Sequence, residues 1–320
     1  MALSRLDPMT SPRYSYLGPE GTFTWEALTR VDGAEAGEWI SVSHVGEALH
    51  DVVSGRSDYA MIAVENSVEG GVSATQDALA ELPGLRIVGE YQVPVQFALV
   101  GRPGTVLSDI RTLAAHPVAY AQCRHWVEQN LPGHIHSPSA SNVQAALDVF
   151  ETAGVDAALA PRGITTRMDV AVLADQVGDN PSAETRFVLV RKGGQVPPRT
   201  GADKTSIIAE LPDDGPGRLL EMLEQFATRG VNMSLLESRP IGDAMGRYRF
   251  VIDLDGHIED ERVADALLGL RRFSPKVIFL GSYPRWNGHR PDVSPRNSDE
   301  AFVEARAWLQ AVIKGLPDLP

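Results

Sequence analysis

The chain has 320 residues, of which 43% are hydrophobic, and this is enough for about two compact domains with cores of their own. Its formal charge is -13, from 29 basic against 42 acidic residues, so no basic surface for nucleic acid or for an anionic membrane is expected. A small-molecule ligand is the default expectation.

Cysteine usage and the N-terminal residues bear on the compartment. The single cysteine, Cys123, cannot form an internal disulfide and has no neighbouring cysteine for zinc, which favours a reducing compartment. Neither a signal peptide nor a run of about 18 apolar residues that could cross a bilayer is recognisable. We therefore expect a cytoplasmic protein, with residues 1–13 as a flexible tail.

The region from residue 14 to 199 alternates between two periodicities. Residues 41–55 have helical spacing, and residues 58–66 form a β-branched run, which is typical of an α/β domain with a largely parallel sheet. The apolar run from Arg86 to Val100 is too long for one strand, and Pro94 interrupts it. We expect this run to cross between two lobes, with a ligand cleft between them.

The rest of the chain is divided by two linkers, at residues 193–203 and 284–296, which are rich in proline and glycine. Between them, residues 203–283 read as strand, helix, strand, strand, helix, strand, which is the ferredoxin-like order. After the second linker, a helix is predicted with Asn297 as its N-cap. Its apolar stripe, expected to dock on the body of the protein or on a partner subunit, contains Phe302, Leu309 and Val312.

Residues 16–24 form the first of three polar segments at the ends of apolar strands. Gly18 and Gly21 let the backbone approach a ligand, and Thr22 or Thr24 could begin a helix whose N-terminus favours anions. An ordinary strand-to-helix turn explains this segment equally well when it is considered alone.

The second and third segments carry side chains suited to hydrogen bonding. Glu65, Asn66 and Ser67 follow a predicted buried strand and offer an acid, an amide and a hydroxyl in succession. Thr185 and Arg186 enter another apolar strand, and an arginine can bind a carboxylate through two parallel hydrogen bonds. Taken singly, a solvated loop and a strand-edge ion pair are the commoner explanations.

Together, these segments resemble the motifs of prephenate dehydratases, GPxGTF, VENSxEG and threonine-arginine-phenylalanine, in that family's order. Residues 116–123 and 139–146 are similar to two further motifs of the family. Residues 203–283 resemble the ACT domain that is attached to these enzymes, through Gly217–Leu219, Gly230–Met233 and Glu237–Pro240. The resemblance covers residues 14 to 285.

Three positions depart from the family pattern. Ala183 stands where the family often has asparagine, Val118 replaces its usual glutamine, and Asn142 its usual threonine. The polar contact that the family has with its substrate near position 183 is therefore left open in this chain.

The resemblance implies a fold and a reaction. The fold is α/β, with a two-lobed periplasmic-binding-protein-like catalytic domain at 14–199 and a ferredoxin-like βαββαβ ACT regulatory domain at 203–283, followed by a linker and helix at 284–320. In the reaction, prephenate loses its ring carboxylate as carbon dioxide while the C4 hydroxyl leaves, and phenylpyruvate forms. Aromatisation drives this step, so no cofactor and no metal are expected.

The resemblance also implies the residues of the site. Thr185 would assist the leaving hydroxyl, and Glu65, Asn66 and Ser67 would complete the catalytic set. The residues expected to bind substrate are Gly18, Pro19, Gly21, Thr22, Arg186 and Phe187.

For the ACT domain, the resemblance implies that phenylalanine binds as an effector between two subunits of a homodimer or homotetramer. The residues expected at that site are Gly217, Leu219, Asn232, Met233, Glu237, Ser238 and Arg239. Two alternatives stay open: an arogenate dehydratase, which has the same motifs, and a non-catalytic amino-acid sensor. His134 and His136 could suggest a metal, but an exposed loop is the commoner explanation of such a pair.

Overall fold

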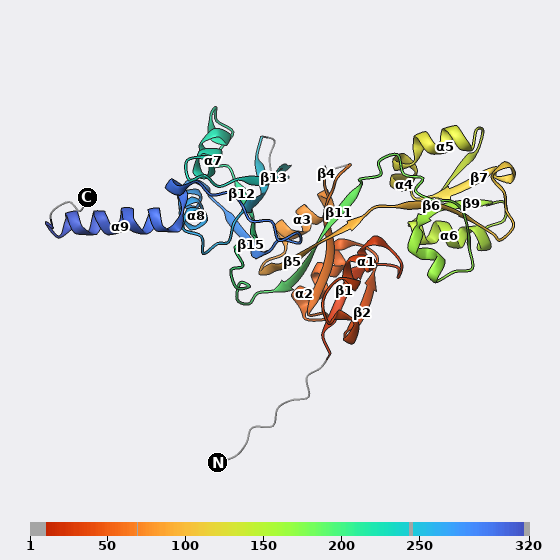
Figure 1. Cartoon of the computed structure of the whole chain (residues 1–320), viewed down its shortest axis with the longest axis horizontal. Coiled ribbons are helices and arrows are strands. Elements are labelled where there is room, and N and C mark those ends of the chain that lie inside the picture. The colour runs from red at the N-terminus through yellow and green to blue at the C-terminus, as the bar shows by residue number, and fades with distance from the viewer. Residues whose placement is uncertain (1–10, 69, 243–245, 317–320) are drawn as a thin grey trace, which may run out of the picture. The chain divides into compact units, whose positions relative to one another are not determined.

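The computed structural model describes residues 11–68, 70–242 and 246–316, so Glu69 of the second polar segment and most of the predicted N-terminal tail lie outside the described residues. Three β-sheets are present (Figure 1). The chain divides into two compact units, one formed by residues up to 72 together with 91–187, the other by 73–90 together with 188–320.

The first sheet has the strand order β2-β1-β3-β11-β5, with the short β4 paired to β3. β1 pairs in parallel with both β2 and β3, as the sequence predicts. Helices α1 (Phe23–Thr29) and α2 (Val45–Ser54) pack against β1 and β3. The strands are β1 (Arg13–Leu17), β2 (Glu38–Val42), β3 (Tyr59–Asn66), β4 (Gly70–Gly71), β5 (Leu85–Pro94) and β11 (Glu184–Lys192).

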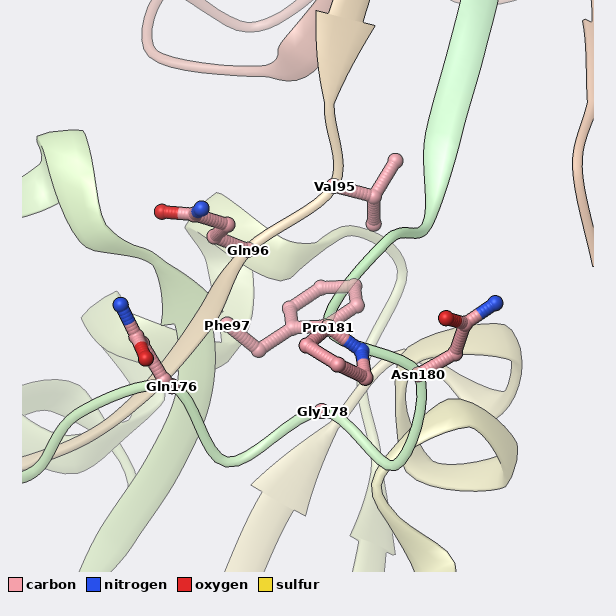
Figure 2. A pocket seen from close by; sticks show the side chains of 7 residues that line it. All are labelled: Val95, Gln96, Phe97, Gln176, Gly178, Asn180 and Pro181. Atoms are coloured by element: carbon pink, nitrogen blue, oxygen red, sulfur yellow. The ribbon is translucent and has the colours of Figure 1, made fainter.

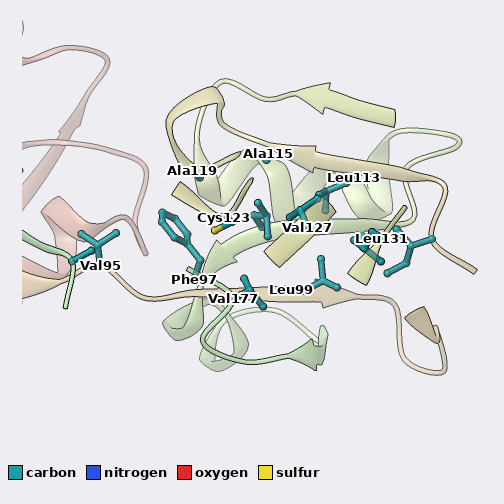
Figure 3. Close-up of a cluster of buried hydrophobic side chains, with 14 residues drawn as sticks. Val95, Phe97, Leu99, Leu113, Ala115, Ala119, Cys123, Val127, Leu131 and Val177 are labelled. Carbon is teal, nitrogen blue, oxygen red and sulfur yellow. The ribbon is translucent and has the colours of Figure 1, made fainter. Parts of the chain in front are cut away.

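The second sheet, of order β10-β6-β9-β7-β8, has helices on both faces (Figure 1). Its strands are β6 (Phe97–Gly101), β7 (Thr112–Ala115), β8 (Ile135–Pro138), β9 (Ala157–Pro161) and β10 (Ala171–Ala174). Successive side chains of a strand point to opposite faces, so Leu99 and Leu159 meet helices α4 (Pro117–Gln122) and α5 (Arg124–Asn130), as Figure 3 shows for Leu99. The smaller Ala98 and Ala158 meet α6 (Asn142–Glu151).

Cys123 lies in the core under α4 and α5 (Figure 3). Burial raises the pKa of its thiol to about 12, so the thiolate that would react or bind a metal is scarce near neutral pH. The cysteine acts as a small core residue.

The apolar run from Arg86 to Val100 crosses between the two lobes, as predicted, but it does so as two strands. β5 ends at Pro94, and β6 begins three residues later in the second sheet, so the apolar run forms two strands. At the break, the Val95 amide donates to the Ala183 carbonyl at 2.7 Å, which holds the outgoing and the returning segments together. The two lobes of the first unit are therefore joined by two adjacent segments.

The third sheet, of order β13-β14-β12-β15, is antiparallel throughout and confirms the βαββαβ order. Its strands are β12 (Asp203–Glu210), β13 (Met233–Pro240), β14 (Tyr248–Asp255) and β15 (Val277–Pro284), and its helices are α7 (Arg218–Ala227) and α8 (Glu261–Phe273). Met222 and Phe226 of α7 and Val263 and Leu270 of α8 fill the core above Ile252 and Leu254. Leu219 and Leu220, in the first turn of α7, are exposed instead.

Residues 73–90, which comprise helix α3 (Ser73–Glu81) and most of β5, pack with this third sheet in the second unit. Lys204 Nζ pairs with Glu90 Oε2 at 3.0 Å, and both side chains are buried. A Cβ at position 281 would come within 2.3 Å of the Ile87 carbonyl oxygen, so only glycine permits this approach. The two compact units are therefore not separated by a single boundary near residue 199, because residues 73–90 belong with the C-terminal part of the chain.

The C-terminal helix α9 (Asp299–Ile313) begins one residue later than predicted. Its N-cap is Ser298, whose Oγ accepts from the Ala301 amide at 3.3 Å, and the predicted cap Asn297 lies in the preceding turn. Leu309 and Val312 of the predicted stripe are exposed in the described chain. Docking of this helix on a partner subunit stays a prediction.

The histidine pair is not in an exposed loop, because His136 belongs to β8 and both rings are half-buried. Tyr120 stacks on His136 and its hydroxyl contacts His134 Nε2 at 2.9 Å. No cluster of three or more histidine, cysteine, aspartate or glutamate side chains that could hold a metal occurs in the described part of the chain. Among the same residues, no helix is long and apolar enough to span a membrane.

Candidate active site

The turn after β1 is built around two glycines. A Cβ on Gly18 would lie 1.7 Å from Ser41 Oγ, and Gly21 has φ of +91°, a conformation that favours glycine. Thr22 is the N-cap of α1: its Oγ1 accepts from the Trp25 amide at 3.3 Å and donates to the Leu17 carbonyl at 3.1 Å. Of the two predicted positions for the helix start, Thr22 or Thr24, the structure has Thr22, and its hydroxyl already has partners within the fold.

The second and third polar segments meet directly. Asn66 Nδ2 donates to Thr185 Oγ1 at 2.9 Å, although the two residues lie far apart in the sequence. Beside them, the Glu184 amide donates to Ser67 Oγ and the Ser67 amide to the Glu184 carbonyl, each at 2.9 Å. The end of β3 and the start of β11 are thereby held in register.

The direction of the Asn66–Thr185 hydrogen bond determines what the threonine can do. The Val68 amide donates to Asn66 Oδ1 at 2.8 Å, which identifies this atom as the oxygen and directs the Asn66 NH2 group toward Thr185. Because Thr185 Oγ1 accepts from Asn66, its own proton can be donated to another group. Thr185 is also buried, which strengthens any hydrogen bond that it makes.

Arg186 carries the charge next to this pair. Its Nε lies 3.2 Å from Glu65 Oε2, and the arginine is buried while the Glu65 side chain is 36% exposed. The two charges balance each other in the chain as described. Phe187, in contrast, is only 2% exposed and packs inside the fold, so a direct contact between its ring and a substrate stays a prediction that the geometry does not favour.

Three cavities lie along the segments that join the lobes. The smallest, of about 60 Å³, is bordered by Val95 and Phe97 from the outgoing segment and by Asn180 and Pro181 from the returning one (Figure 2). A second, of about 430 Å³, is lined by Phe23, Glu26, Pro94, Gln96, Pro161, Arg162, Gly163 and Thr165. The third, of about 350 Å³, is lined by Val68, Val95, Phe97, Ala121, Gln122, His125, Gly178, Asp179, Asn180 and Ala183.

Two residues that line the third cavity are close neighbours of the hydrogen-bonded pair in the sequence. Val68 follows Asn66 by two residues, and Ala183 precedes Thr185 by two. Asn180 lines it as well and supplies a polar group near the position where Ala183 replaces the family's asparagine. Gln96, Gln122 and Asn180 were not singled out as site residues from the sequence. For Gln122, the family-like segment 116–123 was the available signal.

The predicted effector residues are all in the second unit. Gly217, with φ of +84°, precedes α7, and Asn232 Nδ2 donates to Asp255 Oδ2 at 2.8 Å just before β13. Met233, Glu237, Ser238 and Arg239 follow along β13, which ends the sheet among the described strands. Arg239 does not point to an empty site, because it binds Asp77 Oδ2 at 2.6 Å and Ser73 Oγ at 3.1 Å on α3.

Two α/β lobes joined by paired segments, with polar side chains gathered where they meet, define a periplasmic-binding-protein-like domain, here joined to a ferredoxin-like domain. Known proteins identify the particular family. A model of the prephenate dehydratase family matches residues 14–195, and a prephenate dehydratase of Mycolicibacterium gilvum is 40% identical over 96% of this chain and 100% of its own length. This chain belongs to the prephenate dehydratase family.

Solved structures agree with this result. The crystal structure of a prephenate dehydratase from Arthrobacter aurescens in complex with L-Phe has a TM-score of 0.89 and 48% sequence identity, covering 94% of this chain and 99% of its own. GqqA, described as a novel type of quorum quenching acylase, has a TM-score of 0.74 and 30% identity, covering 85% of this chain and 98% of its own. The fold is therefore shared by proteins with different described activities.

Proposed function

We propose that this chain catalyses the decarboxylative dehydration of prephenate to phenylpyruvate where its two lobes join. The observation that carries the proposal is the Asn66–Thr185 hydrogen bond, through which two of the family-like segments form one polar group. The family membership supports the same substrate.

In this reaction the bond between the ring and its carboxylate breaks, and its electron pair enters the ring, which becomes aromatic. The C4–oxygen bond breaks with its electron pair leaving on oxygen, and the hydroxide takes up a proton from solvent to become water. Thr185 donates a hydrogen bond to this hydroxyl and polarises it, because a threonine hydroxyl is too weak an acid at neutral pH to transfer its proton outright. Asn66 fixes the direction of that donation.

The remaining predicted residues orient the substrate. Arg186, paired with Glu65 in the chain as described, borders the reacting group, and Ser67 holds the backbone of Glu184 beside Thr185. In the loop from Gly18 to Thr22, the amides of Gly18 and Thr22 donate to the carbonyls of Val42 and Pro19, which leaves those of Glu20 and Gly21 for an anion. These groups supply position and charge without a cofactor, in keeping with a reaction that is driven by aromatisation.

Arogenate is the alternative substrate, because it differs from prephenate only in an amino group in place of the keto group. The experiment is to incubate the purified chain with prephenate and with arogenate in parallel and to follow the ultraviolet absorption of the aromatic product. We expect prephenate to be turned over with the higher kcat/KM. A higher value for arogenate would reassign the substrate, and no product from either would favour the non-catalytic sensor.

We further propose that residues 14–199 and 203–283 are the catalytic and the regulatory modules and that phenylalanine inhibits through the second one. The L-Phe complex of the relative from Arthrobacter aurescens supports an amino-acid ligand in this fold. The single buried cysteine supports a cytoplasmic location. A homodimer or homotetramer would place Leu219 of one subunit near β13 of another, and light scattering with and without phenylalanine measures its mass.

A further inference from the structure

Arg167 reaches from the second lobe to the glycine loop of the first. It follows the 3-10 turn at Arg162–Thr166, which is anchored in the core of the second lobe by Ile164, only 1% exposed. Its guanidinium pairs with Glu20, and the guanidinium carbon lies 4.0 Å from the centroid of a Trp25 ring. A Cβ at position 21 would lie 3.4 Å from its Cδ, an ordinary van der Waals contact, so the arginine stem passes close to the loop.

A count of charges shows why such an arginine is needed. Prephenate carries two carboxylates, and burying an ionised carboxylate without a partner is costly. Arg186, beside Thr185, is already balanced by Glu65, and Arg167 is balanced by Glu20. The two groups, as described, thus have no surplus positive charge for a dianion, and the whole chain carries -13.

Of the two ion pairs, the one between Arg167 and Glu20 can more easily exchange its carboxylate for one of the substrate. The Glu20 side chain is 59% exposed, so it can turn into water, whereas the Arg167 side chain is 28% exposed and rests on Trp25. Stacking on an aromatic face keeps a guanidinium in place when its carboxylate partner changes. In the Arg186 pair, by comparison, the guanidinium is itself buried, at 9% exposure.

We propose that Arg167 binds the pyruvyl carboxylate of the substrate and that Glu20 occupies the arginine until substrate arrives. The assignment rests on the proposed function. The pyruvyl carboxylate is the one chosen because it remains in the product. A strong ion pair to the ring carboxylate would stabilise the group that must leave as carbon dioxide and would oppose the reaction.

Steady-state kinetics with prephenate separate this role from a merely structural contact between lobes. Arg167→Ala removes the cation and is expected to raise KM about tenfold or more, as is usual for a lost charge-assisted hydrogen bond, and Arg167→Lys gives an intermediate value. Glu20→Gln removes the competing carboxylate, so KM is expected to fall or to stay unchanged. A structural contact predicts instead that both changes weaken the enzyme together, and that result would overturn the proposal.

The choice of carboxylate is tested by inhibition with the product. Phenylpyruvate keeps only the pyruvyl carboxylate, so Arg167→Ala is expected to raise its inhibition constant by the same factor as KM. An unchanged constant would show that Arg167 does not bind this group. Arg124→Ala, which breaks an exposed ion pair with Glu128 on α5, is the matched control and should leave both constants unchanged.

Two further outcomes keep the inferences separate. If the wild-type chain forms no phenylpyruvate from prephenate, the proposed function fails and the assignment of Arg167 falls with it. If the wild type is active and a folded Arg167→Ala or Arg167→Lys chain matches its KM and inhibition constant, only the assignment of Arg167 is wrong. Thermal melting of each variant establishes that it is folded.

Discussion

Asn66 controls the direction in which Thr185 donates, and this leads to a prediction that does not remove the threonine. In Asn66→Asp, a carboxylate of the same shape would accept the Thr185 proton instead of donating to its oxygen. The proton would then point away from the leaving hydroxyl, and turnover should fall roughly a hundredfold or more.

The comparison for this variant is Asn130→Asp, an equal change on the surface of α5, measured under the same conditions. If both variants kept wild-type turnover, the Asn66–Thr185 hydrogen bond would have no part in the reaction.

Arg186→Lys tests the second charged position. Lysine keeps the positive charge but lacks the planar fork, so it cannot hold Glu65 beside Thr185 in the same way. We expect KM for prephenate to rise about tenfold, with a smaller loss of turnover. Unchanged kinetics in a folded variant would make Arg186 a structural residue.

At the residue scale, the sequence could predict a helix start at Thr22 or Thr24 and polar segments at residues 65–67 and 185–186, because each depends on its own segment. It could not predict that Asn66 donates to Thr185, nor that Arg167 lies over Trp25, because these contacts join distant segments. Phe187 was expected at the site because it follows Arg186; its ring is buried, and a contact between it and the substrate stays a prediction.

Among the elements, helix α3 lies along the chain between the proposed catalytic residues 65–67 and the proposed regulatory domain. It begins two residues after β4, the strand that pairs with Glu65 and Asn66, and its Asp77 binds Arg239 of β13 and Arg249 of β14. Hydrogen bonding from Arg239 lowers the pKa of Asp77, so the carboxylate is charged throughout the physiological range. A change at β13 can therefore act on α3.

Asp77→Asn is expected to weaken inhibition by phenylalanine, because the neutral amide cannot hold two guanidinium groups. The phenylalanine concentration for half inhibition should rise about fivefold or more, the lower end of a usual allosteric coupling, while turnover without phenylalanine changes little. The change is compared with Glu128→Gln, which breaks a surface pair on α5. Equal inhibition of all three chains would exclude α3 from the coupling.

Helix α9 is attached mainly through its first turns. Asp299 accepts from the Glu261 amide at 2.9 Å and pairs with Arg199, while Val303, Trp308, Leu309, Val312 and Ile313 are exposed. A chain that ends after Arg296 is expected to form a smaller oligomer if this apolar surface meets a partner subunit. An unchanged molar mass and melting temperature would show that the helix is dispensable.

Periodicity predicted most helices and strands, including the βαββαβ order, because side-chain spacing reports which face is buried. It placed the start of α9 at Asn297, since asparagine and serine are both good N-caps and only the structure distinguishes Ser298. It could not assign residues 73–90 to the second compact unit, since that depends on contacts such as Lys204 with Glu90.

At the scale of the whole molecule, the contacts between residues 73–90 and the third sheet decide how regulation should be studied. A chain that ends near Arg199 would lose Lys204, which pairs with Glu90, together with most of the unit to which residues 73–90 belong. Loss of inhibition in such a chain would therefore be hard to separate from loss of folding, and point variants of the full chain are the better instrument.

The central claim is that the full chain forms phenylpyruvate through Thr185, and one experiment tests it directly. Purified wild-type and Thr185→Ala chains are incubated with prephenate, and phenylpyruvate is followed by its ultraviolet absorption. We expect turnover by the wild type and a loss of roughly a hundredfold to ten-thousandfold in the variant, with an unchanged melting temperature. No phenylpyruvate from the wild type, or wild-type turnover by a folded Thr185→Ala chain, would contradict the account.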